Sequence, residues 1–232
     1  MSIALKNVTK KYDDRIVLND FFISFEEGKI NCILGPSGIG KTTILRVLAG
    51  LTDYSGFVER PEKVSYIFQD SRLLPNLTVW ENVEYVILDI PKEQRPPLIK
   101  NLLELTELYD RRNDFPQSLS GGMARRVAIA RAYAYSADLL LMDEPFSALD
   151  TGLKLRQIAV YKTLASKYPR TSIFVSHDID EALLFADKVF VMADGKIAET
   201  INLTPTGDYR DLFSPETLNA KKRLFEALTK KY

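Results

Sequence analysis

The sequence predicts an α/β fold with a mixed sheet as its core, an antiparallel β subdomain and an inserted helical subdomain. Two continuous apolar runs, residues 139–142 and 172–175, are typical of parallel strands buried on both faces. Short β-rich stretches at 3–8 and 16–25 flank a turn at Asp13-Asp14 and predict an antiparallel start. The stretch from about 70 to 135 contains five prolines and two expected helices, which predicts the helical insert.

The elements of the core follow in order along the chain. Residues 30–34 are a compact apolar run that predicts a strand. A helix is expected after it, with Gly50 as its end and one apolar face formed by Ile44, Val47, Leu48 and Leu51. Within the insert, helices are expected at 98–109 and 122–135.

The carboxyl-terminal part contains two further signals. Asp194-Gly195 lies between two short apolar stretches and predicts a β-hairpin. Ser214-Pro215-Glu216 predicts the start of a last helix, with serine as its cap and proline in its first turn.

We therefore expect a single domain of 232 residues. Its catalytic α/β core with the β subdomain comprises residues 1–70 and 136–205. The helical insert comprises 71–135, and a helical tail comprises 206–232.

Composition excludes several classes of protein. Basic and acidic side chains number 31 each, so no net field would hold nucleic acid or an anionic membrane surface. Cys32 is the only cysteine, which excludes an internal disulfide and indicates a small strand residue. No charge-free apolar run approaches about 18 residues, so we expect a soluble, cytoplasmic chain and membrane spans on another subunit.

A phosphate-binding loop (P-loop) is the first motif that carries chemistry, and its residues are Gly35-Pro36-Ser37-Gly38-Ile39-Gly40-Lys41-Thr42. The pattern G-x-x-x-x-G-K-[ST] lets successive backbone N–H groups surround the phosphates of a nucleotide, with a helix amino terminus behind them. Lys41 is expected to reach the β- and γ-phosphates, Thr42 to bind Mg²⁺, and Thr43 to be a further nucleotide-binding residue. A plain glycine turn is the alternative, but this loop follows a strand and opens a helix, as nucleotide binding requires.

Two acids at the end of an expected buried strand form the second motif. Asp143 is placed to bind Mg²⁺, because a buried charge needs compensation. Glu144 can polarise the water that attacks the γ-phosphate. A helix cap is the alternative role of Asp143, and the complete P-loop makes it the weaker interpretation.

These motifs indicate a nucleoside triphosphatase, and the segment Leu119-Ser120-Gly121-Gly122-Met123, which we call the signature segment, narrows the class. It resembles the signature of ATP-binding-cassette (ABC) ATPases. Other marks of that family occur in the expected order: Tyr12, Gln69, Ser147-Ala148-Leu149-Asp150 and His177. The resemblance covers residues 3–199, nearly the whole chain.

The resemblance implies a role for each mark. Two ATP molecules would lie between two head-to-tail subunits, with Ser120, Gly121 and Gly122 against the γ-phosphate held by the partner's P-loop. Tyr12 would stack on adenine, Gln69 would sense Mg²⁺ and the attacking water, His177 would bind the γ-phosphate, and Asp150 would reach the other subunit. The alternatives are ordinary strand packing for Tyr12, a surface loop for Gln69, a capping turn for residues 120–122 and a structural role for His177. Arg125 and Arg126 are interpreted as a solvated helix face and left out of the site.

Met123 departs from the usual glutamine, and Ala124-Arg125 follow where glutamines are common. With residues 140–146, the signature segment looks most like importers of the nitrate, sulfonate and taurine group, which includes thiamine-precursor importers. Phe115-Pro116-Gln117 is importer-like too. The resemblance thus implies a peripheral ATPase at the cytoplasmic face of the membrane, with two permease subunits and an extracytoplasmic solute-binding protein.

Two other functional classes remain as alternatives. A ribosome- or DNA-remodelling ATPase would carry two cassettes or a long coiled-coil insertion, and this chain has one P-loop and a short insert. In a small-molecule P-loop kinase, the signature segment, Gln69 and His177 would be coincidental. For the transporter we expect exposed apolar residues at 72–77 to form the permease-docking surface, although they could instead pack within the insert.

Overall fold

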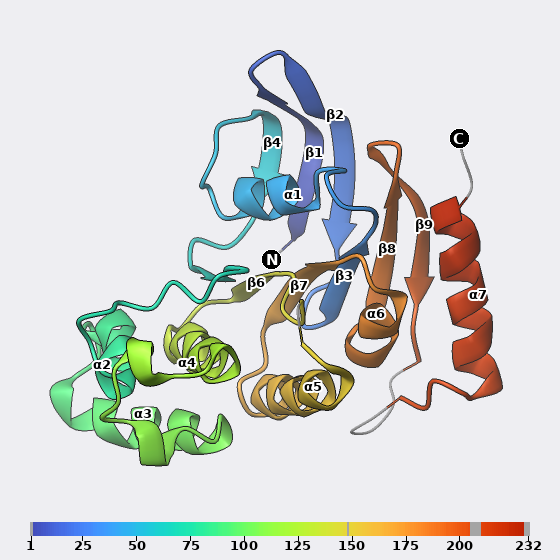
Figure 1. Ribbon diagram of the computed structural model, residues 1–232. Helices are drawn as coiled ribbons and strands as arrows, with labels where there is room; N and C mark the ends of the chain where they lie inside the picture. Colours follow the sequence, from blue (N-terminus) through green and yellow to red (C-terminus); the bar gives the residue numbers. More distant parts are fainter. Residues whose placement is uncertain (1, 148, 205–209, 230–232) are drawn as a thin grey trace.

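The computed structural model describes residues 2–147, 149–204 and 210–229, which form two sheets with helices between and around them (Figure 1). The predicted α/β fold, with its antiparallel subdomain and helical insert, is confirmed. The division at 70/71 and 135/136 stays a prediction, and the proposed boundary at 205/206 lies outside the described residues.

The amino-terminal sheet has three antiparallel strands in the order β2-β1-β4. They are β1 (Ile3–Tyr12), β2 (Arg15–Phe25) and β4 (Ser55–Glu59). Asp13 lies in the turn between β1 and β2 with a left-handed φ of 49°, a conformation that Asp tolerates better than most residues.

The central sheet has six strands in the order β5-β6-β7-β3-β8-β9. Its members are β5 (Val64–Ile67), β6 (Leu139–Asp143), β7 (Thr171–Ser176), β3 (Ile30–Leu34), β8 (Lys188–Ala193) and β9 (Lys196–Asn202). All are parallel except β9, which returns antiparallel to β8. The predicted hairpin is confirmed, since Asp194 and Gly195 join β8 to β9 with φ of 46° and 74°.

Helices cover both faces of the central sheet and build the insert (Figure 1). The core helices are α1 (Lys41–Leu48), α5 (Thr151–Lys167), α6 (Ile179–Phe185) and α7 (Pro215–Thr229). The insert holds α2 (Val79–Glu84), α3 (Arg95–Leu105) and α4 (Gly121–Ala134), joined by the short 3₁₀ turns Tyr85–Ile87, Lys92–Gln94, Tyr109–Arg111 and Pro116–Ser118.

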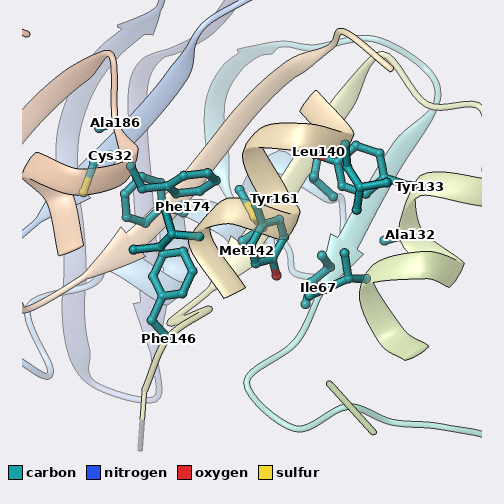
Figure 2. Packing of buried hydrophobic residues seen from close by; sticks show 14 of the residues in the cluster. Cys32, Ile67, Ala132, Tyr133, Leu140, Met142, Phe146, Tyr161, Phe174 and Ala186 are labelled. Carbon is teal, nitrogen blue, oxygen red and sulfur yellow. The ribbon is translucent and has the colours of Figure 1, made fainter. Parts of the chain in front are cut away.

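Alternation along the buried strands creates two apolar cores. Leu139 and Leu141 of β6 pack with α1 and the antiparallel sheet. Leu140 and Met142 face the opposite way, into the core shared with α4, α5 and α6 (Figure 2). Because both faces are covered, β6 and β7 are buried along their whole length, which explains the continuous apolar runs. Cys32 is a fully buried strand residue, as predicted.

Helices α1 and α3 begin or end at other residues than the sequence predicts. Helix α1 ends at Leu48, and Leu51 lies beyond it, 57% exposed. The N–H of Gly50 donates to Val47 O and that of Leu51 to Arg46 O, a Schellman motif in which Leu51 follows the left-handed glycine. Helix α3 begins at Arg95 rather than 98, because prolines fit a first turn whose N–H groups have no intrahelical partner. It ends at Leu105 rather than 109, shortly before Glu107, whose left-handed φ of 56° does not continue a helix.

The last helix starts as predicted, and the Ser214 hydroxyl accepts from the N–H of Thr217 at 3.3 Å. The expected exposure of the apolar residues at 72–77 is wrong for its leucines, which are half-buried. Leu73 packs on the core, and the Asn82 amide bonds to the backbone of Leu74 and fixes the loop. None of the described helices is both long and apolar enough to span a bilayer.

A glycine in β4 lies close to the backbone of the neighbouring strand β1. Gly56 has a φ of 104°, and a Cβ placed there would lie 2.3 Å from Asn7 O. We expect Gly56→Ala to lower the free energy of unfolding by about 3 kcal/mol, because strain and a backbone clash add. Gly28→Ala is the control, since its φ of 68° gives strain without any contact within 4 Å. Urea unfolding should show a loss of only about 1 kcal/mol for the control, and equal losses would contradict the clash.

Candidate active site

The carboxyl ends of neighbouring parallel strands bring the predicted site residues to one edge of the central sheet. Gln69 follows β5, Asp143 ends β6, His177 follows β7, and the P-loop follows β3. The register fixes their levels: Asp143 lies beside Val175, and Leu34 lies beside Ser176. This edge is where ligands bind in open α/β sheets.

Glycines shape the P-loop for close approach to an anion. A Cβ on Gly35 would lie 2.7 Å from Met192 O of β8, so no larger residue fits where the loop leaves the sheet. Gly38 and Gly40 have φ of 78° and 114°, which favours glycine. Gly40 is the N-cap of α1 and has no side chain to accept a hydrogen bond, so the first N–H groups of this helix are left for an anion in the loop.

Lys41 is held inside the P-loop rather than extended into solvent. Its side chain is 5% exposed, and Nζ donates to Gly35 O at 2.7 Å and Pro36 O at 2.8 Å. Burial lowers the pKa of this ammonium group, while the carboxylates of Glu144 and Asp143 oppose that shift. Two of its three donors are used within the loop, which leaves one for a phosphate oxygen.

Asp143 is the buried carboxylate of the site. One oxygen accepts from the Thr42 hydroxyl at 2.9 Å and the other from the Tyr66 hydroxyl at 3.2 Å. Burial, and then the charge of Asp143, raise the pKa of Tyr66 far above its usual range, so Tyr66 remains a neutral donor. Both partners of Asp143 are neutral hydroxyls, and its charge is not balanced by a direct ion pair within the described ranges.

Glu144 has an unusual backbone, with a left-handed φ of 46°. Its Oε1 lies 3.4 Å from Nδ1 of His177, which is 54% exposed, so the structure brings these two predicted residues together. Gln69 is exposed two residues after β5, and its backbone oxygen accepts from Arg125 Nη1 at 3.1 Å.

Tyr12 ends β1 beside the helix that follows the P-loop, and its side chain is 37% exposed. Burial raises the pKa of its phenol, but hydrogen bonds with Thr43 and Thr52 and the nearby Arg46 outweigh this and lower it. Lys10 Nζ lies 4.7 Å from the centre of the Tyr12 ring, a cation–π contact on one face. Tyr12 is thereby anchored at both its hydroxyl and its ring.

The signature segment lies apart from the P-loop of its own chain. Ser120 caps α4 by accepting from Met123 N at 3.3 Å, and a Cβ on Gly121 or Gly122 would meet nothing within 4 Å. Ser120 and Gly122 open onto a pocket of about 240 Å³ between α4 and α5, and no P-loop residue lines it. Asp150 caps α5 through Leu153 N at 2.9 Å, and Ala148 lies outside the described residues.

A partly buried ionic network beside His177 was missed from the sequence. Lys154 Nζ of α5 lies 2.8 Å from both Asp178 Oδ2 and Glu181 Oε1, and Glu181 also accepts from the Ser176 hydroxyl. Burial opposes the ionisation of Asp178, yet Lys154 holds its pKa below the usual range. The network fixes the residues on both sides of His177. Lysine four residues after Asp150, with acids one and four residues after the histidine, was the available signal.

The interpretation of Arg125 as a solvated residue is wrong. Its side chain is buried, and Nη2 donates to Glu144 O at 2.6 Å. Most residues of α4 are buried, Arg125 among them, whereas the next residue, Arg126, lies on the side of the helix that reaches the surface. Arg126, by contrast, pairs with the exposed Glu107 as a surface residue does.

Comparisons with known proteins agree with this geometry. Residues 18–147, more than half of the chain, match the family described as ABC transporter. The chain is 36% identical over 230 residues to the aliphatic sulfonates import ATP-binding protein SsuB 1 of Paracoccus denitrificans, covering 98% of this chain and 93% of the relative. It is 37% identical to the sulfate/thiosulfate import ATP-binding protein CysA of Escherichia coli, covering 86% and 60%. A dimeric post-hydrolysis state of the ATP-binding cassette MJ0796 with ADP and Pi superposes with a TM-score of 0.76 at 31% identity, covering 88% and 100%.

The ionic network gives a stability prediction. Lys154→Met leaves Glu181, whose side chain is only 7% exposed, without its cation. We expect the free energy of unfolding to fall by about 2 kcal/mol, less than for a fully buried pair because Lys154 is partly exposed.

Urea unfolding measures this loss, and Lys222→Met is the control because its pair with Glu226 is exposed. Glu181→Gln in the Lys154→Met background should restore part of the stability. An equal effect of the two lysine variants would show that the network contributes nothing.

Proposed function

The chain belongs to the ABC transporter ATPase family and binds and hydrolyses ATP; on this premise we propose that it powers the import of a small anion. Two copies of the chain, each with ATP and Mg²⁺, would act on separate permease subunits. The observation that carries the proposal is the meeting of Lys41, Thr42, Asp143, Glu144 and His177 at the carboxyl edge of the central sheet. Each contributes a different part of phosphoryl-transfer chemistry.

The P-loop is built to hold the phosphates of ATP. Backbone N–H groups at the start of α1 and the remaining donor of Lys41 offer hydrogen bonds to phosphate oxygens, and Lys41 is held in place by the loop itself. The ring of Tyr12 lies beside the same helix through its contact with Thr43, and we propose that adenine stacks on the ring.

The residues around Asp143 fit Mg²⁺. A hydroxyl from Thr42 and a carboxylate from Asp143 lie 2.9 Å apart, and hard oxygen donors are what this ion prefers. The described residues contain no cluster of three or more His, Cys, Asp or Glu side chains, as expected where substrate phosphates and water complete the shell. Bound Mg²⁺ would neutralise charge on the phosphates, and exposed Gln69 is the proposed sensor of its presence.

Glu144 is the proposed residue that polarises the attacking water, because its carboxylate lies at the site, 3.4 Å from Nδ1 of His177, and forms no ion pair with a lysine or arginine within the described ranges. His177 is proposed to hydrogen-bond the γ-phosphate, and the network of Lys154, Asp178 and Glu181 keeps it in place.

A second copy of the chain would complete the site. The signature segment opens onto its own pocket rather than onto the P-loop, and a helix amino terminus capped by Ser120 suits an anion. The similar MJ0796 cassette is dimeric. We propose a head-to-tail dimer in which Ser120, Gly121 and Gly122 contact the ATP of the partner and Asp150 lies at the interface.

The relatives support the direction and class of transport. Both are named as import ATP-binding proteins, one for aliphatic sulfonates and one for sulfate or thiosulfate. We propose an oxyanion of this kind as solute, a peripheral location at the cytoplasmic face of the membrane, and an extracytoplasmic solute-binding protein as further partner.

The permease is proposed to dock where the insert meets edge strand β5. A groove of about 380 Å³ lies there, lined among others by Tyr66, Phe68, Val86 and Arg131. Arg72 stacks on Phe68 at 3.8 Å, which connects the groove to the loop at 72–77. A cysteine at Asn76, which is exposed, should crosslink to a permease loop in membranes, and a cysteine at the distant exposed Phe213 should not. Crosslinking from Phe213 alone would contradict this surface.

Glu144→Gln tests the catalytic proposal. Glutamine keeps the size of the side chain but is a much weaker base, so we expect hydrolysis to fall by roughly a hundredfold or more while ATP still binds. Size-exclusion chromatography with ATP and Mg²⁺ should then show a stable species of twice the monomer mass. Hydrolysis near the wild-type rate would remove Glu144 from this role.

Adding Ser120→Arg to Glu144→Gln supplies the control for the shared site. A large cation at the amino terminus of α4 should prevent the trapped dimer, whereas each monomer should still bind nucleotide at its own P-loop. A dimer of undiminished stability would show that the signature segment does not act across the interface.

A further inference from the structure

Arg125 lies in the second turn of α4, five residues after Ser120, and connects two catalytic loops. Its side chain is 8% exposed, although it carries a permanent charge. Nη1 donates to Gln69 O at 3.1 Å, and Nη2 donates to Glu144 O at 2.6 Å. These loops follow β5 and β6, so a single guanidinium group joins helix, water-sensing loop and acidic strand.

The Glu144 carbonyl oxygen accepts three hydrogen bonds. Besides Arg125, it accepts from the N–H of Ser147 at 3.2 Å and from the Ser147 hydroxyl at 3.1 Å. Glu144 itself has a left-handed φ of 46°, which non-glycine residues adopt only where the surroundings impose it. The donors therefore stabilise the backbone conformation that directs the Glu144 side chain toward His177.

The surroundings of Arg125 indicate that its role is to position the two loops rather than to stabilise the core. Its Nε forms no well-aligned hydrogen bond in the described part of the chain, and the Tyr161 hydroxyl and the Gln157 amide of α5 lie beside it. Buried polar atoms without partners reduce stability, and their presence in a core calls for another explanation. The two carbonyl bonds are what fix the guanidinium group.

We propose that Arg125 is a positioning residue: it couples contact between the amino terminus of α4 and the partner's ATP to the positions of Gln69 and Glu144. This inference rests on the proposed catalytic role of Glu144. Ser120 caps helix α4, so contact of this amino terminus with the partner's ATP moves or steadies Arg125, which lies on the same helix. Arg125 in turn sets the backbone of both loops, and attack on the phosphate becomes efficient once the dimer has formed.

Arg125→Met tests the proposal, with Arg170→Met as its matched control. Arg170 also donates to backbone carbonyls, those of Ala132 and Tyr133 in α4 and of Tyr135 directly after it, but at the opposite end of the helix. We expect Arg125→Met to lower kcat by roughly tenfold or more, with KM for ATP changed by less than about twofold, because the P-loop is intact. Arg170→Met should reduce the melting temperature yet leave kcat and KM near the wild-type values per folded molecule.

A second readout does not depend on turnover. In the Glu144→Gln background, Arg125→Met should still form the ATP-dependent dimer, which places its defect after dimer formation. If Arg125→Met does not fold, Arg125→Lys replaces it. A single nitrogen cannot span both carbonyls as the guanidinium fork does, so kcat should again fall while KM is kept.

The outcomes separate this inference from the proposed function. Unchanged kcat in Arg125→Met or Arg125→Lys, or a loss equal to that of Arg170→Met, overturns the role of Arg125 while Glu144 keeps its own. Rapid hydrolysis by Glu144→Gln overturns the catalytic proposal first, and with it this inference.

Discussion

Parallel pairing of β5, β6, β7 and β3 sets the geometry on which the site depends. Along β6, Leu139, Leu141 and Asp143 point to the side of α1, and this parity brings Asp143 within 2.9 Å of Thr42. A slip of one residue between β6 and β7 would turn the carboxylate into the apolar core beneath α4 and α5. Burial of both faces makes such a slip costly, so the cores specify the register and the register specifies the site.

Local patterns were sufficient to predict much of this arrangement. The P-loop, the buried runs, the hairpin at Asp194-Gly195 and the cap at Ser214 depend on neighbouring residues, and each was found as predicted where described. The end of α1 was misplaced because Leu51 fits the helical period, yet a left-handed Gly50 ends the helix before it. The catalytic and binding roles of the site residues stay predictions.

Arg125 and Lys154 show what the sequence could not provide. Each contacts residues that are distant along the chain: Gln69 is 56 positions from Arg125, and Asp178 is 24 positions from Lys154. A charged residue on a helix is usually solvated, and composition offers no sign that a helix is enclosed on several sides. The packing of α4 and α5 against the strand ends makes these two cations partners of the loops that carry the candidate site.

The burial of Cys32 has a practical consequence. Its sulfur is fully buried in β3, and burial raises the pKa of the thiol well above its usual range, so little reactive thiolate forms. Since the chain has no other cysteine, the natural sequence already serves as an unreactive background for thiol-directed probes. Fluorophores or spin labels attached to one introduced cysteine would report from that position alone, and distances between two copies of the chain could be followed through the ATP cycle.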